Sequence, residues 1–328
     1  MNSLYLFLGQ VLIIAIPLIV TALGGMFTER SGVINIALEG IMIIGAFVGI
    51  LFLNVIPFKS DGTGFLAYFL GMFFAGLAGA LVGLLHGVAS IKMKGDQTIS
   101  ATAINTLIPA LCILLTVTFN ISGVSDSEKF QIHNAEFLKI DAVPLLSQIP
   151  VIGDIFFQRT SPSLYFGIII IIISWIVINK TRFGLRLKAC GENPSAADSA
   201  GINPIKYRYF GVALSGILAG VGGFFLVTGY SSEFMANSTA SYGFLALAIM
   251  IFGNWKPGGI VGGAILFATL VTLSSGLAYF PFLENLLNRW NIDKEIIHML
   301  PYITTIIVLI FASKNSHAPA SEGIPYEK

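Results

Sequence analysis

Long apolar runs with few charges recur along the whole chain, and they constrain its fold more than any other feature. A helix needs about 20 apolar residues to cross a hydrocarbon core of about 30 Å, and most of the runs approach that length. The runs cover residues 4 to 23, 34 to 53, 65 to 90, 99 to 119, 163 to 179, 209 to 228, 242 to 253, 259 to 280 and 297 to 312. We therefore predict an all-α polytopic membrane protein with about nine transmembrane helices, if the short run from 242 to 253 also crosses.

The composition excludes two large classes of protein. The sequence is 55% hydrophobic and 11% charged, and its mean hydropathy of +0.84 lies far outside the range of soluble chains. The formal net charge of +1 provides no basic field for nucleic acid, because neutralising phosphates requires clustered lysine and arginine. A lipid bilayer is the expected environment, and nucleic acid is not an expected partner.

Lysine and arginine in the connecting loops predict the orientation. Lys92 and Lys94 lie in one loop, a larger basic loop covers 180 to 208, and two spans separate the two loops. Basic loops stay in the cytoplasm. We therefore expect a single transmembrane domain over 1 to 313 with its N-terminus outside, an external loop at 120 to 162, and a cytoplasmic tail at 314 to 328.

Small residues recur every fourth position in two of the runs. They are Gly71, Ala75, Gly79, Gly83 and Gly87 in one, and Gly211, Ser215, Ala219 and Gly223 in another. In lipid, helices associate through the close approach of such faces, so we expect both stripes to meet other helices. A pore lined by glycine backbone is the functional alternative, and the lack of polar side chains beside the stripes favours packing.

The segment from Gly24 to Gly40 interrupts apolar sequence with glycines and charged or polar side chains. Backbone that leaves the helix at membrane depth needs protein or water to satisfy its amides, so such breaks mark transport routes. Asn35 and Glu39 stand four apart and share a helical face. Glu39 could line the route or make a structural hydrogen bond, and we expect Glu29 and Arg30 to form an interfacial ion pair near the cytoplasm.

A second polar stripe follows in the fourth apolar run. Thr98, Thr102 and Asn105 are spaced four and three apart, which places them on one helical face, and Pro109 frees the carbonyl of residue 105 from its helical bond. The stripe could contact substrate, or the proline could form a kink satisfied by neighbouring side chains. Another break, from 253 to 263, matches the position of the first, and paired breaks predict an inverted repeat.

The large basic loop contains signals for one short helix. Asn193 is a capping residue, Pro194 suits the first helical position, Gly201 suits a left-handed end and Pro204 prevents continuation. The small residues between Ser195 and Ala200 would suit docking into the cleft of another protein. A plain connector helix is the alternative.

The sequence lacks the motifs of several catalytic classes. It contains no G-x-x-x-x-G-K-[ST] loop, no G-x-S-x-G, no H-E-x-x-H and no Cys/His cluster with metal spacing. We therefore expect a transport subunit without catalytic residues, metal or cofactor of its own. Any energy from ATP would come from a separate subunit.

Two motifs carry a resemblance to a known family. The runs Glu29 to Gly40, ERSGVINIALEG, and Leu187 to Ile202, LKACGENPSAADSAGI, resemble the permease subunits of bacterial ABC importers in the ribose and branched-chain amino acid class. Ribose-type relatives read closer to G-I-D-L-S-V-G at the first motif. The chain is most similar to the nucleoside importer permeases, and the similarity covers nearly its whole length.

The resemblance implies a multi-pass protein of the bacterial cell membrane and a set of partners. These are a second homologous permease, a cytoplasmic ATPase that uses ATP and Mg, and an extracellular or periplasmic substrate-binding protein that delivers nucleoside. The helix at 193 to 201 would be the coupling helix, with Glu192, Asn193, Pro194, Ala196, Ala197 and Gly201 as coupling residues. Asn35, Glu39, Thr102 and Asn105 become the candidates for the substrate pathway.

Other functions remain open at this point. The substrate could be a simple sugar or a branched-chain amino acid. An ion-coupled secondary transporter would use acidic or histidine relays within its spans, and Glu39 is the one strong acidic candidate. An intramembrane enzyme would need a nucleophile with a base, or a metal cluster.

Overall fold

The structure is a computed structural model of the 328-residue chain. It describes residues 3–55, 63–119, 161–231, 241–275 and 317–327, together with 129–132, 233–235 and isolated positions elsewhere. Helices dominate the described residues, and two short strands, β1 (Lys129–Gln131) and β2 (Glu233–Met235), pair in antiparallel fashion. The prediction of an all-α polytopic membrane protein is confirmed.

Seven helices in the described part of the chain are long and apolar enough to cross a membrane. They are α1 (Ser3–Glu29), α2 (Leu38–Val55), α3 (Thr63–Gly87), α4 (Gln97–Thr118), α6 (Pro162–Lys180), α9 (Pro204–Leu226) and α11 (Pro257–Ser275). The short π-helices η1 (Val88–Lys92) and η4 (Val227–Ser231) extend α3 and α9. The run from 297 to 312 lies outside the described residues except for isolated positions, so its crossing of the membrane stays a prediction.

Three shorter helices complete the bundle: α7 (Arg182–Glu192), α8 (Pro194–Ser199) and α10 (Tyr242–Phe252). The α10 helix has 11 residues and rises about 16 Å, which is about half of a bilayer core. The run from 242 to 253 therefore does not cross the membrane as a helix.

Local capping explains where several helices begin. Asp96 accepts hydrogen bonds from the amides of Thr98 and Ile99 at the start of α4, and Ser161 caps α6 with Pro162 at the first helical position. Such oxygen atoms satisfy amides that have no partner within the helix.

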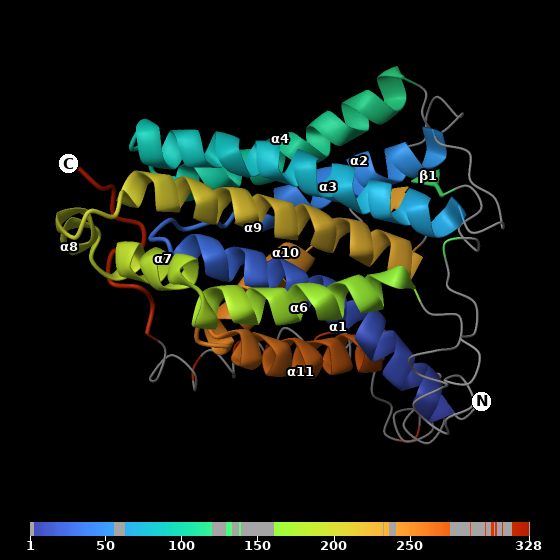
Figure 1. Cartoon of the computed structure of the whole chain (residues 1–328). Helices are drawn as coiled ribbons and strands as arrows, with labels where there is room; N and C mark the ends of the chain where they lie inside the picture. The colour runs from blue at the N-terminus through green and yellow to red at the C-terminus, as the bar shows by residue number, and fades with distance from the viewer. Residues whose placement is uncertain are drawn as a thin grey trace.

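The basic loop 180–208 and the loop 120–162, which the sequence assigns to opposite sides of the membrane, connect helices at opposite ends of the bundle. Figure 1 shows α7, α8 and the C-terminus at one end, whereas α1 begins and β1 lies at the other. Most of 120–162 lies outside the described residues. The arrangement agrees with loops on opposite faces, and the side of the membrane that each face occupies stays a prediction.

The α9 helix is central and contacts α1, α2 and α3. A Cβ atom on Gly79 would lie 2.2 Å from the Gly216 carbonyl oxygen, and one on Gly216 would lie 2.3 Å from the Gly79 carbonyl oxygen. The prediction that the α3 stripe packs against another helix is confirmed. On α9, the row that meets α3 is Val212, Gly216 and Gly220, one position beyond the predicted row.

The predicted row on α9 packs against the end of α1 and against α2. Gly211 approaches Ser31 and the Phe27 carbonyl, and a Cβ atom on Gly223 would lie 2.0 Å from the carbonyl oxygen of Met42 in α2. Small residues on two faces thus allow α9 to approach three helices at once.

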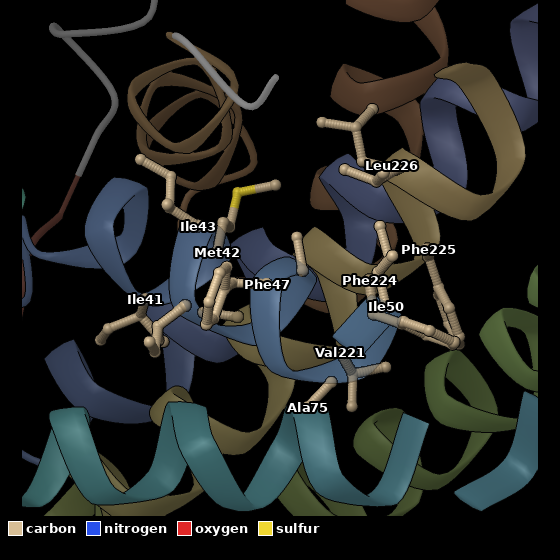
Figure 2. Packing of buried hydrophobic residues seen from close by; sticks show 14 of the residues in the cluster. Ile41, Met42, Ile43, Phe47, Ile50, Ala75, Val221, Phe224, Phe225 and Leu226 are labelled. Carbon is tan, nitrogen blue, oxygen red and sulfur yellow. The ribbon is translucent and has the colours of Figure 1, made fainter. Parts of the chain in front are cut away.

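Aromatic and branched side chains fill the interior near η4. Figure 2 shows Phe224 and Phe225 of α9 beside Ile50 of α2, in one cluster of buried residues. The ring of Tyr68 lies 5.0 Å from that of Phe224 between centroids, and its hydroxyl hydrogen bonds the Thr228 hydroxyl at 3.0 Å. The buried tyrosine therefore keeps a polar partner.

Candidate functional site

The chain leaves the helix between α1 and α2, and side chains from other spans satisfy the broken backbone. The Ile34 amide donates to Gln97 Oε1 at 2.7 Å, and the Ile34 carbonyl lies 2.8 Å from His86 Nε2. Because a carbonyl can only accept, Nε2 carries the proton. The Ile36 carbonyl accepts from Asn105 Nδ2 at 3.0 Å. The break is therefore held by α3 and α4, as non-helical backbone at membrane depth requires.

Asn35 holds the same break against α9. Its side chain is fully buried, and its Nδ2 donates to Ser215 Oγ at 2.9 Å. Its Oδ1 accepts the Ala37 amide at 3.1 Å. Asn105 adds a second clamp, because its Oδ1 accepts the Gly40 amide at 2.8 Å. Contact of either side chain with a substrate stays a prediction.

Glu39 binds the beginning of α10. Its Oε2 accepts the Gly243 amide at 2.7 Å, and its Oε1 accepts the Ser241 amide at 3.1 Å. Ser241 has a φ of +71°, and the side chain of Glu39 is buried. These bonds supply the structural alternative for Glu39, while a role in lining the route stays a prediction.

We expect Glu39→Ala to lower the free energy of unfolding by about 1–3 kcal/mol, because the buried Gly243 amide and the part-buried Ser241 amide lose their acceptor. Glu39→Gln keeps one acceptor oxygen, so its free energy of unfolding should lie between those of the parent and of Glu39→Ala. The measurement is the melting temperature of each purified variant in detergent, paired with uptake. If a variant melts at the parent temperature but no longer transports, Glu39 lines the route and its structural role is contradicted.

The polar stripe on α4 divides into two roles. Asn105 turns toward α2, whereas Thr98, Thr102 and Thr106 follow one another at four-residue spacing and are exposed. The Thr102 hydroxyl donates to the Thr98 carbonyl at 3.0 Å, and Thr106 bonds the Thr102 carbonyl at 3.2 Å. Each hydroxyl oxygen keeps accepting capacity, so this face can meet a polar solute.

The second break, between α10 and α11, meets the first. Asn254 and Trp255 have φ values of +53° and +49°, and the Trp255 indole donates to Glu29 Oε2 at 2.5 Å. Arg30 donates to the carbonyls of Trp255 and Asn254 at 3.3 and 3.4 Å. The two breaks are therefore in contact, and an inverted repeat stays a prediction.

The predicted ion pair between Glu29 and Arg30 is wrong. Glu29 is buried and bonds Trp255, whereas Arg30 Nη1 lies 3.7 Å from Glu192 Oε1 at the end of α7. Side chains of adjacent residues point in different directions on a helix, so each finds its own partner.

The signals for a short helix after Glu192 are confirmed. Asn193 Oδ1 accepts the Ala196 amide at 2.9 Å, Pro194 occupies the first helical position, and Gly201 follows with a φ of +79°. Within α8 the exposed side chains are those of Ser195, Ala196 and Ser199. Ala197 is buried within this chain. The docking role predicted for Ala197 and for the other coupling residues stays a prediction.

Comparison with known proteins identifies the family. The sequence-family model described as the permease component of the branched-chain amino acid transport system matches residues 7–309. The chain is 40% identical to the nucleoside ABC transporter permease protein NupC of Lactococcus lactis, over 100% of this chain and 98% of that protein.

Two further relatives extend this result. The guanosine ABC transporter permease protein NupQ of Bacillus subtilis is 40% identical over 97% of this chain and 95% of its own length. NupB of Lactococcus lactis, another nucleoside ABC transporter permease protein, is 26% identical over 82% of this chain and 72% of its own length. No solved structure matches. The chain belongs to the branched-chain amino acid transport system permease family of ABC transporters.

Proposed function

We propose that this chain is the permease subunit of an ATP-driven importer of nucleosides in a bacterial cell membrane. The observation that carries the proposal is the 40% identity, over nearly the full length of both chains, to two permeases named for nucleosides and guanosine. The fold supports it, because two contacting helix breaks lie among the spans as a solute route requires.

The importer would contain a second, homologous permease and two further kinds of subunit. NupC and NupB are both named nucleoside permease proteins of Lactococcus lactis, which supports a pair of related permeases. A cytoplasmic ATPase would bind the exposed residues of α8 and supply the energy from ATP and Mg. A substrate-binding protein would deliver nucleoside at the opposite end of the bundle, where α1 begins.

The route would pass the helix break between α1 and α2. Asn35, Glu39 and Asn105 would keep the broken backbone in position, since their polar atoms bond amides or carbonyls of that region and of α10. Thr102 would face the solute, because its side chain is exposed. The basic end of the bundle, with α8 and the C-terminal tail, would be cytoplasmic.

The test is purification of the tagged chain from its native membrane in mild detergent, with identification of accompanying proteins and reconstitution into vesicles. We expect an ATPase and a second permease to accompany it, and ATP-dependent uptake of radiolabelled guanosine that excess uridine or adenosine reduces. Glucose and leucine serve as competitor controls. Competition by glucose alone would reassign the substrate to sugars, and a homo-oligomer without ATPase would favour a secondary transporter.

A further inference from the structure

The C-terminal segment 317–327 returns to the end of the bundle that carries α8, as the red trace in Figure 1 shows. The His317 amide donates to Asn254 Oδ1 and Glu327 pairs with Lys94, while the residues between them bond three further parts of the molecule. Within this segment, Ala320–Ile324 makes the contacts that join the parts, and we call these five residues the tail strap.

The first contact joins the tail strap to the end of α7, directly before α8. The Ser321 amide donates to the Gly191 carbonyl at 2.9 Å, and the Ser321 hydroxyl donates to the Glu192 carbonyl at 3.1 Å. The Ala320 amide donates to Glu192 Oε2 at 3.3 Å. Because Glu192 also pairs with Arg30, the junction of α7 and α8 is tied to the end of α1.

The second contact joins the tail strap to the helix break. The Gly323 amide donates to the Gly32 carbonyl at 3.2 Å. Gly323 has a φ of +75°, and a Cβ atom on it would lie 2.8 Å from Ile34 Cδ1. Only glycine fits this position without strain, so the strap lies directly against the broken backbone.

The third contact joins the tail strap to α9. Arg208 is 2% exposed, and its Nη1 donates to the Ile324 carbonyl at 2.9 Å. Among the described residues, its Nε and Nη2 atoms have no hydrogen-bond partner. A buried guanidinium with so few partners is costly, so the tail carbonyl is an important acceptor for it.

The tail strap also shields part of a carboxyl group, because Glu322 is half-buried and its Oε2 has no hydrogen-bond partner among the described residues. Burial raises the pKa of Glu322, while a side-chain hydrogen bond with Glu29 and the charge of Arg30 act in the opposite direction. Two carboxyl groups in contact are compatible when one of them holds a proton. The middle of the strap is thus partly shielded from solvent, whereas Ala320 and Ile324 at its two ends are exposed.

We propose that the tail strap is a positioning element of transport, which carries the displacement of α8 to the helix break between α1 and α2. The strap is bonded to α7, to Gly32 and to Arg208, so α8 cannot move from the break without disturbing it. The inference rests on the proposed function, which supplies the ATPase that would bind and displace α8. The strap itself is assigned from contacts within this chain.

The test is Gly323→Val in the complete transporter, with Pro325→Ala as the control because Pro325 is exposed. We expect both variants to assemble with the ATPase and to hydrolyse ATP. Nucleoside taken up per ATP should fall about fivefold in Gly323→Val alone, within the range that mutations on coupling routes produce.

A second readout separates release of the strap from general damage. Cys190 is buried beside Gly191, and Cys112 is buried within α4. In a Cys112→Ala background, we expect a soluble maleimide to label Cys190 faster in Gly323→Val than in the parent. Equal labelling together with normal uptake per ATP would overturn the proposal.

Ser321→Ala decides the case if Gly323→Val fails to fold. It removes only the hydroxyl bond to Glu192, and a lower uptake per ATP supports the strap, whereas an unchanged ratio overturns it. Failure of the proposed function looks different, since the unaltered complex would then lack the ATPase or would not transport nucleoside.

Discussion

Gly216→Leu is expected to prevent accumulation of the folded protein. Even a Cβ atom at this position would lie 2.3 Å from the Gly79 carbonyl oxygen, and backbone of a neighbouring helix cannot move aside as a flexible side chain can. Overpacking costs about 1–3 kcal/mol or more, against a total stability of about 5–15 kcal/mol. Leucine adds three further carbons to a contact that has no room for the first, so we place the effect at the upper end.

The measurement is fluorescence-detected size exclusion of a tagged protein in mild detergent. Gly262→Leu in α11 is the matched control, because a Cβ atom at Gly262 meets nothing within 4 Å. The control should elute as a single peak at the level of the parent, while Gly216→Leu is lost or aggregated. A sharp peak and normal melting for Gly216→Leu would show that α3 and α9 do not pack as described.

Ala196→Trp is expected to abolish uptake without harming the fold. Ala196 is exposed on α8, so the indole can point into solvent, but it would prevent a close fit of α8 into a cleft. Loss of a central interface contact costs about 2 kcal/mol or more, which corresponds to a more than tenfold loss of affinity.

The measurements are uptake, ATP hydrolysis and recovery of the ATPase on purification. Ala196→Ser keeps the small size and should behave as the parent. Ala197 is unsuitable for this test because it is buried, and a large residue there would disturb α8 itself. Full uptake and full ATPase recovery with Ala196→Trp would return α8 to the role of a connector.

The spans and the ends of α8 could be predicted from sequence because each depends on local chemistry. Apolar length is set by the bilayer, and Asn193 with Pro194 defines a helix start through atoms that are neighbours in the chain. The direction of Ala197 could not be predicted in this way. A six-residue helix is too short for its buried face to show as a repeating pattern.

The support of the helix break depends on contacts between distant residues. His86 is isolated from the other histidines in sequence, yet it bonds the carbonyl of Ile34 across 52 positions. The sequence marks the break by its glycines and polar residues, but it does not say which spans complete it. Only the packing of α3 and α4 against α2 brings Gln97, Asn105 and His86 to the same backbone.

The cap of α10 has an electrical consequence. A half-helix whose N-terminus lies among membrane spans presents a positive dipole end that attracts anions. In this chain Glu39 already occupies the amides of Ser241 and Gly243 at that end. A solute on a route past α10 would therefore meet a dipole end whose amides are already bonded to Glu39, which would suit an uncharged cargo and oppose a phosphorylated one.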